Sequence, residues 1–243
     1  MTDRRHRQLR RATFVVLAAG AAVASGVLGA AALGTGKTLP PGTLRGPAHL
    51  LQQYPSMSLA TPAQRAAAQR LLNRTRRATL PWRNADVALS DGFATDRART
   101  LPPTAPVGIF HAENRSFRND GRTLDPHRAE TLIYANAPGH PLVLIGVMYG
   151  VARGVHGPTP GGPITRWHRH SVCAQGKKRG TTPRRDGTCP PGTKRRLGSE
   201  MLHIWFTRDL RSAYAIHAPD PELCRDGLYP PERCGGHQHH HHG

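Results

Sequence analysis

Leu142–Tyr149 is the feature that most constrains the fold, because every residue in it except Gly146 is apolar or aromatic. A β-strand places successive side chains on opposite faces, so this segment is apolar on both faces and is expected to be the central strand of a sheet. Glu130–Tyr134 is a second strong strand candidate, and the Pro-Gly pair within Asn136–His140 is typical of a hairpin loop between the two. The two segments predict an antiparallel hairpin in the middle of the fold.

Two helices are expected ahead of this hairpin. Thr61 is a good N-cap and Pro62 suits the first helical position, so a helix is predicted over Ala63–Arg77. A second helix is predicted from Pro81 to Gly92, where the glycine suits a C-terminal cap. Together they predict a helical hairpin laid on the sheet.

Further strands are expected at Val107–His111, within Gly162–His170 and at Glu200–Phe206, with Ser212–His217 as a last strand. The order of elements predicts an α+β fold. It would consist of an N-terminal signal or anchor helix, a helical hairpin, and then a mainly antiparallel β-sheet or a small β-barrel.

The first 33 residues form a targeting segment. Arginines are followed by the apolar or small stretch Ala12–Leu33, which fits a signal peptide and is also long enough to span a bilayer. Cleaved signal peptide and uncleaved membrane anchor are both open, and either places the chain outside the cytoplasmic membrane, secreted or anchored to its outer face. Residues 34–60 are expected to be a flexible linker, 61–234 the α+β domain and 235–243 a disordered His-rich tail.

All four cysteines, Cys173, Cys189, Cys224 and Cys234, follow residue 170. An even number in an exported protein indicates two disulfides, and the sequence allows three connectivities. Local pairing, Cys173 with Cys189 and Cys224 with Cys234, is favoured because both intervening stretches are rich in Gly, Pro and charge. A thiolate metal site is the alternative.

The chain carries 34 basic and 15 acidic side chains, a formal net charge of +19. Such a basic exported protein could bind an anionic envelope component. Aromatic residues do not interleave with the basic runs and no nucleic-acid-binding motif is present, so no specific nucleic-acid partner is expected. The insertion Gly176–Arg196 is either a solvated loop or a docking patch, and its basic residues are Lys177, Lys178, Arg179, Arg184, Arg185, Lys194, Arg195 and Arg196.

A His-x-His pair provides the first half of a candidate site. His168 and His170 are expected on one face of their strand, with Trp167 and Arg169 on the other. Imidazole is the commonest protein ligand for Zn, Cu, Fe and Ni, so such a pair is half of a metal site. A surface pair or a hydrogen-bonded pair is the alternative.

Two further strands carry an inward histidine. His203 lies on a strand that is apolar on both faces, where a polar group needs a partner. His111 and Glu113 share a face of a short strand end. The sequence predicts one metal site built from His168, His170 and His203, with His111 or Glu113 as the next ligand; a hydrogen-bonded polar core is the alternative. The remaining pocket residues are expected to be Trp167 and Trp205 in the wall, Asn114, and Arg166 or Arg169 as the group that holds an anionic ligand.

Two family resemblances follow from these motifs. Gly162–His170 resembles the opening of the first cupin motif, a Gly, five residues and His-x-His, with Gln175 near the place of the motif's Glu. This partial resemblance implies a cupin-like β-barrel. Residues 60–225 resemble a family of uncharacterised exported actinobacterial proteins through motifs that include Ala85–Phe93, Gly121–Pro126, Trp167–His170 and Met201–Trp205. That resemblance implies an exported domain with a His-rich pocket and brings no activity with it.

Two functions are open. The first is an exported or membrane-tethered domain that binds a divalent transition metal through histidines on β-strands. Three ligands with an open position would permit hydrolytic or oxidative chemistry, and four would indicate a structural or metal-handling role. The second is a cell-envelope binding module without metal, in which the basic insertion docks an anionic partner. Since the common nucleophile, phosphate-loop and His-Glu-x-x-His motifs are absent, no catalytic residue is assigned.

Overall fold

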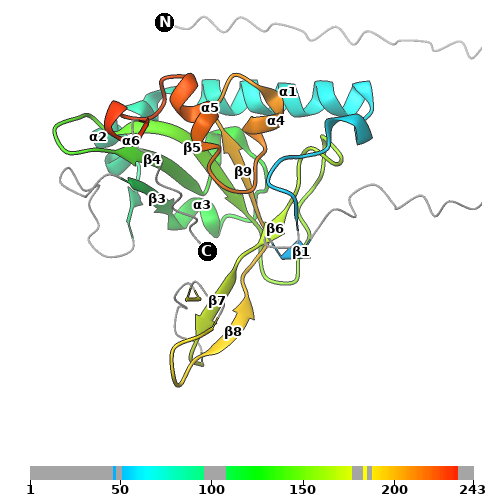
Figure 1. The fold of residues 1–243 in the computed structure, drawn as a ribbon, viewed down its shortest axis with the longest axis vertical. Helices are drawn as coiled ribbons and strands as arrows, with labels where there is room; N and C mark the ends of the chain where they lie inside the picture. The colour runs from blue at the N-terminus through cyan, green and yellow to red at the C-terminus, as the bar shows by residue number, and fades with distance from the viewer. Residues whose placement is uncertain (1–45, 48–50, 96–107, 177–182, 185–187, 235–243) are drawn as a thin grey trace, which may run out of the picture. The chain divides into compact units, whose positions relative to one another are not determined.

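The core of the protein is an open, mostly antiparallel sheet in a computed structural model that describes residues 46–47, 51–95, 108–176, 183–184 and 188–234 (Figure 1). From edge to edge the strands are β1 (Gly46–Pro47), β6 (His168–Arg169), β9 (Met201–Trp205), β5 (Val143–Gly150), β4 (Thr131–Asn136), β3 (Gly108–Asn114) and β2 (Phe93–Ala94). All neighbours are antiparallel except β1 with β6. The expected α+β fold is confirmed, and β5 is the central strand.

The alternative of a cupin-like barrel is wrong. A barrel requires its first and last strands to pair, and within the described residues β1 and β2 lie at opposite edges of the sheet. Both edge strands are only 2 residues long. Short edges leave few unpaired backbone groups, so the open sheet is protected without closure.

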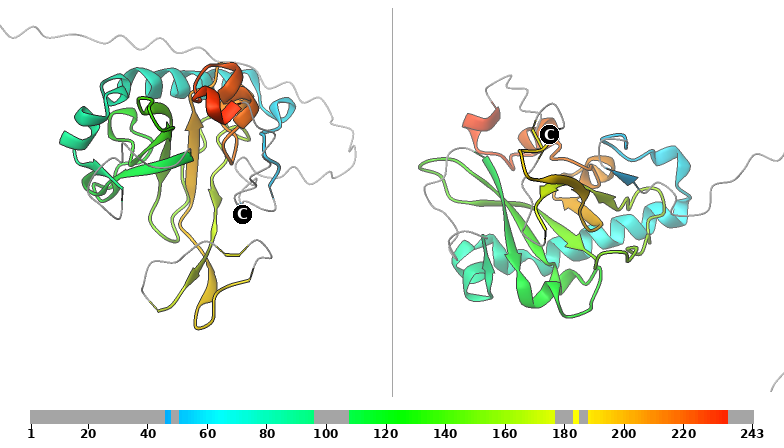
Figure 2. Two further views of the ribbon diagram at one scale, coloured as in Figure 1. Left: turned by 60° about the vertical axis from the view of Figure 1, so that its left-hand side comes forward. Right: turned by 90° about the horizontal axis from the view of Figure 1, so that it is seen from below.

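One face of the sheet is covered by α1 (Pro62–Ala78), as Figure 2 shows. The Thr61 side chain accepts from the Gln64 N–H, and the Gln64 side chain accepts from the Thr61 N–H, which is a capping box. Ala68, Leu71 and Leu72 are buried against the larger hydrophobic core on this face. The predicted first helix is therefore confirmed, with its apolar stripe on the sheet.

The second helix of the expected hairpin is divided into η3 (Leu80–Arg83) and α2 (Ala85–Ser90). Asn84 separates them because its backbone is extended and its side chain accepts from the Asp86 N–H as the N-cap of α2. The remaining short helical elements are η2 (Met57–Leu59), α3 (Arg115–Arg118) and η4 (Pro126–Arg128).

The C-terminal part contributes α4 (Leu210–Ala213), α5 (Asp220–Arg225) and α6 (Pro231–Cys234). The right-hand view in Figure 2 shows this part of the chain on the face of the sheet away from α1. Leu223 and Tyr229 belong to a second hydrophobic cluster. The strand expected at Ser212–His217 is wrong. Asp209 caps α4 by accepting from the Ser212 N–H, so a local capping interaction turns this segment into a helix and an irregular stretch.

β5 is apolar on both faces because it contributes to both cores. Leu144 and Val147 pack in the core under α1, whereas Ile145 and Met148 pack in the second cluster. The register against β4 shifts here, and Gly146 lies where a Cβ would be 2.7 Å from the Ile204 carbonyl oxygen. A glycine at this position therefore permits the close approach of β5 to the backbone of β9.

A separate two-stranded ribbon, β7 (Ser171–Ala174) with β8 (Lys194–Leu197), extends away from the sheet (Figure 1). The Cys173–Cys189 disulfide joins this ribbon to its loop, and Cys224–Cys234 joins α5 to α6. Both predicted local pairings are confirmed. Two disulfides indicate an oxidising compartment.

The domain begins before Thr61, because β1 pairs with β6 and the Ile216 N–H donates to the Gln53 carbonyl. The predicted signal or anchor (1–33) and the His-rich tail (235–243) lie outside the described residues. Within the residues described, no helix is long and apolar enough to cross a membrane.

Candidate functional site

Five histidine rings gather on the face of the sheet opposite α1. His111 comes from β3, His168 from β6, His203 from β9, His170 from the residue after β6, and His217 from the segment after α4. The ring centres of His168 lie 5.0 Å from those of both His170 and His203. The other neighbours are His170 and His217 at 5.4 Å, and His111–His203 and His170–His203 at 6.2 Å each.

The curvature of the sheet brings these rings together. β3 and β9 are separated by β4 and β5, so in a flat sheet their side chains would be about 14 Å apart. The rings of His111 and His203 are 6.2 Å apart, which requires the sheet to curl toward this face. His168 is directly opposite Met201 in the β6–β9 pair, and Met201 shares its face with His203 by alternation.

His203 and His168 are each held by one ring nitrogen. Nδ1 of His203 donates to the Ile216 carbonyl at 2.6 Å, and Nδ1 of His168 makes a longer contact of 3.5 Å with the Arg166 carbonyl. A carbonyl only accepts, so Nδ1 carries the proton in both rings and Nε2 has a lone pair. Both Nε2 atoms are buried and have no hydrogen-bond partner among the described residues.

The three predicted ligands are neutral at physiological pH. Burial, followed by the nearby charge of His170, lowers the pKa of His168 to about 3. Burial, followed by the charges of His217 and His111, lowers the pKa of His170 to about 4. Burial also lowers the pKa of His203 well below its ordinary value. A neutral imidazole has a free lone pair and can therefore be a metal ligand.

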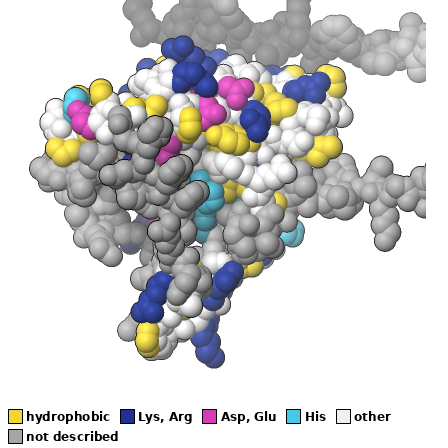
Figure 3. Space-filling view, in the orientation of Figure 1, with side chains coloured by type: hydrophobic (Ala, Val, Ile, Leu, Met, Phe, Trp, Pro, Cys, Tyr) yellow, Lys and Arg dark blue, Asp and Glu magenta, His cyan; other side chains and the backbone are white. Residues whose placement is uncertain are grey.

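The cluster reaches the surface on one side. His168 and His203 are 0% and 6% exposed, His170 is half-buried, and His111 and His217 are exposed. Figure 3 shows histidine side chains at the surface in the middle of this face, above the basic ribbon. In the described part of the chain, no group of three or more His, Cys, Asp or Glu side chains is already arranged to hold a metal ion.

Glu113 and Asn114 have other contacts. The Glu113 carboxylate forms an ion pair with Arg118 at 2.5 Å. Asn114 points to the opposite face from His111, by alternation along β3. Its side chain caps α3 by accepting from the Ser116 and Phe117 N–H groups and also donates to the Asp91 carbonyl. Among the described residues, neither side chain forms a hydrogen bond or ion pair with a ring of the cluster.

The four remaining predicted pocket residues divide between the two faces. The ring of Trp205 lies 5.2 Å from that of His203, and its Nε1 donates to the Ala215 carbonyl, so it lines the cluster as expected. Trp167 is instead buried in the core under α1. Arg169 is paired with Glu200 at 3.1 Å, whereas Arg166 lies close enough to His168 for its charge to lower the pKa of that ring.

Sequence reasoning missed Gln53 and His217. The Gln53 side chain donates to the His217 carbonyl at 2.9 Å and accepts from the His217 N–H at 3.1 Å. The Gln53 carbonyl accepts from the Ile216 N–H, so Gln53 fixes the segment whose Ile216 carbonyl holds His203. These contacts join residues 164 apart in sequence, and no local pattern could have indicated them.

Comparison of the chain with protein-family models, curated proteins and solved structures gave no match in any of the three.

Proposed function

We propose that this domain binds a divalent transition metal through His168, His203 and His170. The observation that carries the proposal is the pair of buried Nε2 atoms without partners, each on a ring whose Nδ1 faces a backbone carbonyl. Metal-binding histidines commonly have this arrangement, because the second nitrogen donates to a carbonyl or carboxylate and fixes the tautomer. A buried acceptor without a partner is otherwise unfavourable, which argues against a structural polar core.

The spacing of the rings supports the same ligand set. With Zn–N bonds of about 2.0–2.1 Å in a tetrahedral site, neighbouring imidazole centres lie about 5 Å apart. His168 is 5.0 Å from both His170 and His203. The remaining distance, His170 to His203 at 6.2 Å, would have to shorten as the ligands turn toward a shared ion.

The metal is one of those that imidazole favours, Zn, Cu, Fe or Ni. In a tetrahedral site, three imidazoles leave one coordination position open. The exposed His111 and His217 lie on the solvent side of the cluster. A solvent-accessible position suits binding of a further ligand better than a closed structural site does. With the predicted targeting segment, the site would face the cell exterior, in a secreted or anchored protein.

Metal analysis of the purified chain tests the proposal. The tail histidines His237 and His239 to His242 are replaced by alanine, so that the count reports the cluster alone; this protein is called the tail-alanine chain below. We expect about one metal ion per chain, lost in both His168→Ala and His203→Ala. His127→Ala, an exposed histidine outside the cluster, is the matched control and should retain the metal. Absence of metal from the correctly folded tail-alanine chain would refute the proposal.

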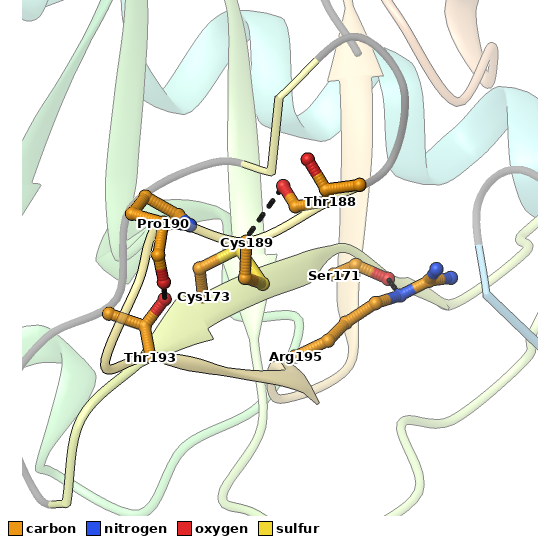
Figure 4. Close-up of a disulfide and its surroundings, with 7 residues drawn as sticks. All are labelled: Ser171, Cys173, Thr188, Cys189, Pro190, Thr193 and Arg195. Carbon is orange, nitrogen blue, oxygen red and sulfur yellow. Dashed lines mark hydrogen bonds between the residues drawn. A yellow bond between two sulfur atoms is a disulfide. The ribbon is translucent and has the colours of Figure 1, made fainter.

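A second candidate function is docking of an anionic envelope component by the β7–β8 ribbon. All four residues of β8, Lys194–Leu197, are exposed, and no carboxylate pairs with its three cations among the described residues. The Cys173–Cys189 disulfide fixes the ribbon, and Arg195 donates to Ser171 across it (Figure 4). Co-sedimentation with anionic vesicles, compared between the tail-alanine chain and Arg195→Gln with Arg196→Gln, tests it. Unchanged sedimentation of the double variant would exclude it.

A further inference from the structure

Arg166 is a buried cation without an acidic partner. Its side chain is 6% exposed, and Nη2 donates to the Gln53 carbonyl at 3.2 Å. Its Nε is buried without a hydrogen-bond partner, and no carboxylate of the described residues forms an ion pair with it. A buried charge that lacks both a counter-ion and a full set of hydrogen bonds is costly to fold.

Backbone contacts place this guanidinium beside the histidine cluster. The Gln53 carbonyl accepts from both Arg166 and the Ile216 N–H, and the Ile216 carbonyl in turn holds Nδ1 of His203. Arg166 also precedes His168 by two residues. Arg166 is therefore linked through the Gln53 carbonyl and the Ile216 peptide to His203, whose Nε2 has no partner among the described residues.

Two carboxylates, one on β3 and one directly before β9, lie close to histidines of the cluster in the sequence, and both are used elsewhere. Glu113 is paired with Arg118, and Glu200 contacts both Arg169 and His156. By alternation along β9, Glu200 lies on the face opposite His203. The cluster therefore combines neutral imidazoles with an unpaired cation, and the proposed metal would add further positive charge.

We propose that Arg166 binds the anionic group of this site's ligand, a small molecule that carries a carboxylate or a phosphate. The planar guanidinium offers paired N–H donors that match either group in a bidentate geometry. The ligand would thus be held by its anion at Arg166 with another part over the histidine cluster. The neighbourhood of a metal rests on the proposed function, whereas the anion site itself depends only on Arg166.

Calorimetric titration of the tail-alanine chain with inorganic phosphate and, separately, with acetate tests this inference. Each titration is made on metal-free and zinc-loaded protein, and zinc content is measured on the same samples. Binding of at least one probe should weaken about tenfold or more in Arg166→Met, because a charge-assisted hydrogen bond is lost. Zinc content should not change. The probe that binds tells a phosphate site from a carboxylate site.

Two further variants separate this reading from others. Arg70→Gln removes an exposed positive charge from α1, on the other side of the sheet, and should leave the affinity unchanged. Should Arg166→Met fail to fold, Arg166→Lys keeps the charge without the planar fork and should bind more weakly than the parent chain. Absence of binding by both probes, or an affinity unaffected by substitution of Arg166, would overturn the inference while leaving zinc binding intact. Arg166-dependent anion binding by a protein that takes up no zinc when zinc is supplied would instead support the anion site and refute the proposed metal.

Discussion

Replacement of His168 by leucine should stabilise the metal-free protein. The side chain is fully buried, and its Nε2 has no partner among the described residues. Such a buried, unpaired polar atom costs about 1–3 kcal/mol. The contact that would be lost, Nδ1 to the Arg166 carbonyl, is 3.5 Å long and is therefore at the weak end of hydrogen bonds. Leucine is apolar and of similar size. The substitution therefore removes the cost of the unpaired Nε2, which is larger than the stabilisation lost with the weak Nδ1 contact.

The expected gain is about 1 kcal/mol in the free energy of unfolding, or roughly 2–4 °C in melting temperature for a domain of this size. Guanidinium titration in the presence of a chelator, with the disulfides intact, measures it. Zinc should raise the stability of the parent chain and not that of His168→Leu, because only the parent has the ligand. His127→Leu, at an exposed position, should leave both quantities nearly unchanged.

The opposite sign would refute this reasoning. If His168→Leu loses more than about 1 kcal/mol in the metal-free state, then Nε2 is satisfied in solution and His168 is a structural core residue. If the variant gains stability yet still responds to zinc as the parent does, the cluster is not the zinc site. Both results are available from the same set of unfolding curves.

Three other substitutions test the surrounding structure. Gln53→Ala should lower the free energy of unfolding by about 1–2 kcal/mol, because two hydrogen bonds to the His217 backbone are lost, and should weaken zinc binding about tenfold. Calorimetry measures both quantities, and Gln52→Ala, at the exposed neighbouring position, should change neither. Burial raises the pKa of Glu130 to about 7, so the free energy of unfolding of the wild type should fall by up to about 3 kcal/mol as pH rises from 4.5 to 7. Glu130→Gln should abolish this part of the pH dependence. Gly146→Ala should destabilise by at least about 2 kcal/mol, seen in thermal unfolding, because its Cβ would meet the Ile204 carbonyl at 2.7 Å.

The elements that the sequence predicted correctly are those with a local signature. The apolar run at Val143–Gly150, the cap at Thr61 and the Gly/Pro-rich stretches between neighbouring cysteines each determine structure within a few residues. The face on which His203 lies was predicted in the same way, because alternation along Met201–Trp205 puts it opposite Leu202 and Ile204. Local periodicity was sufficient for these features.

The errors arose where a distant contact or a local cap decides the structure. Gln53 lies in a stretch without a regular pattern, and its role depends on His217, 164 residues away. The segment Ser212–His217 contains a tyrosine and an isoleucine, which favour a strand, yet Asp209 caps a helical turn at its start. Glu113 has the right position in its strand for a ligand, and an ion pair with Arg118, five residues later, engages its carboxylate in this structure. Alternation fixes the face of a side chain, but not its partner.

The distribution of unpaired polar atoms argues that this face of the sheet is built for a ligand. Among the described residues, four buried side-chain nitrogens have no hydrogen-bond partner, and three of them belong to Arg166, His168 and His203. If these were incidental defects, they would be spread over both cores, since each costs a substantial part of a domain's net stability. The core under α1 instead satisfies its buried polar groups, as Thr75 does with Tyr149 and Tyr214 with the Ala68 carbonyl. Two lone pairs that can bind a metal and one cation that can bind an anion therefore meet at one place, where a ligand with both features would satisfy all three.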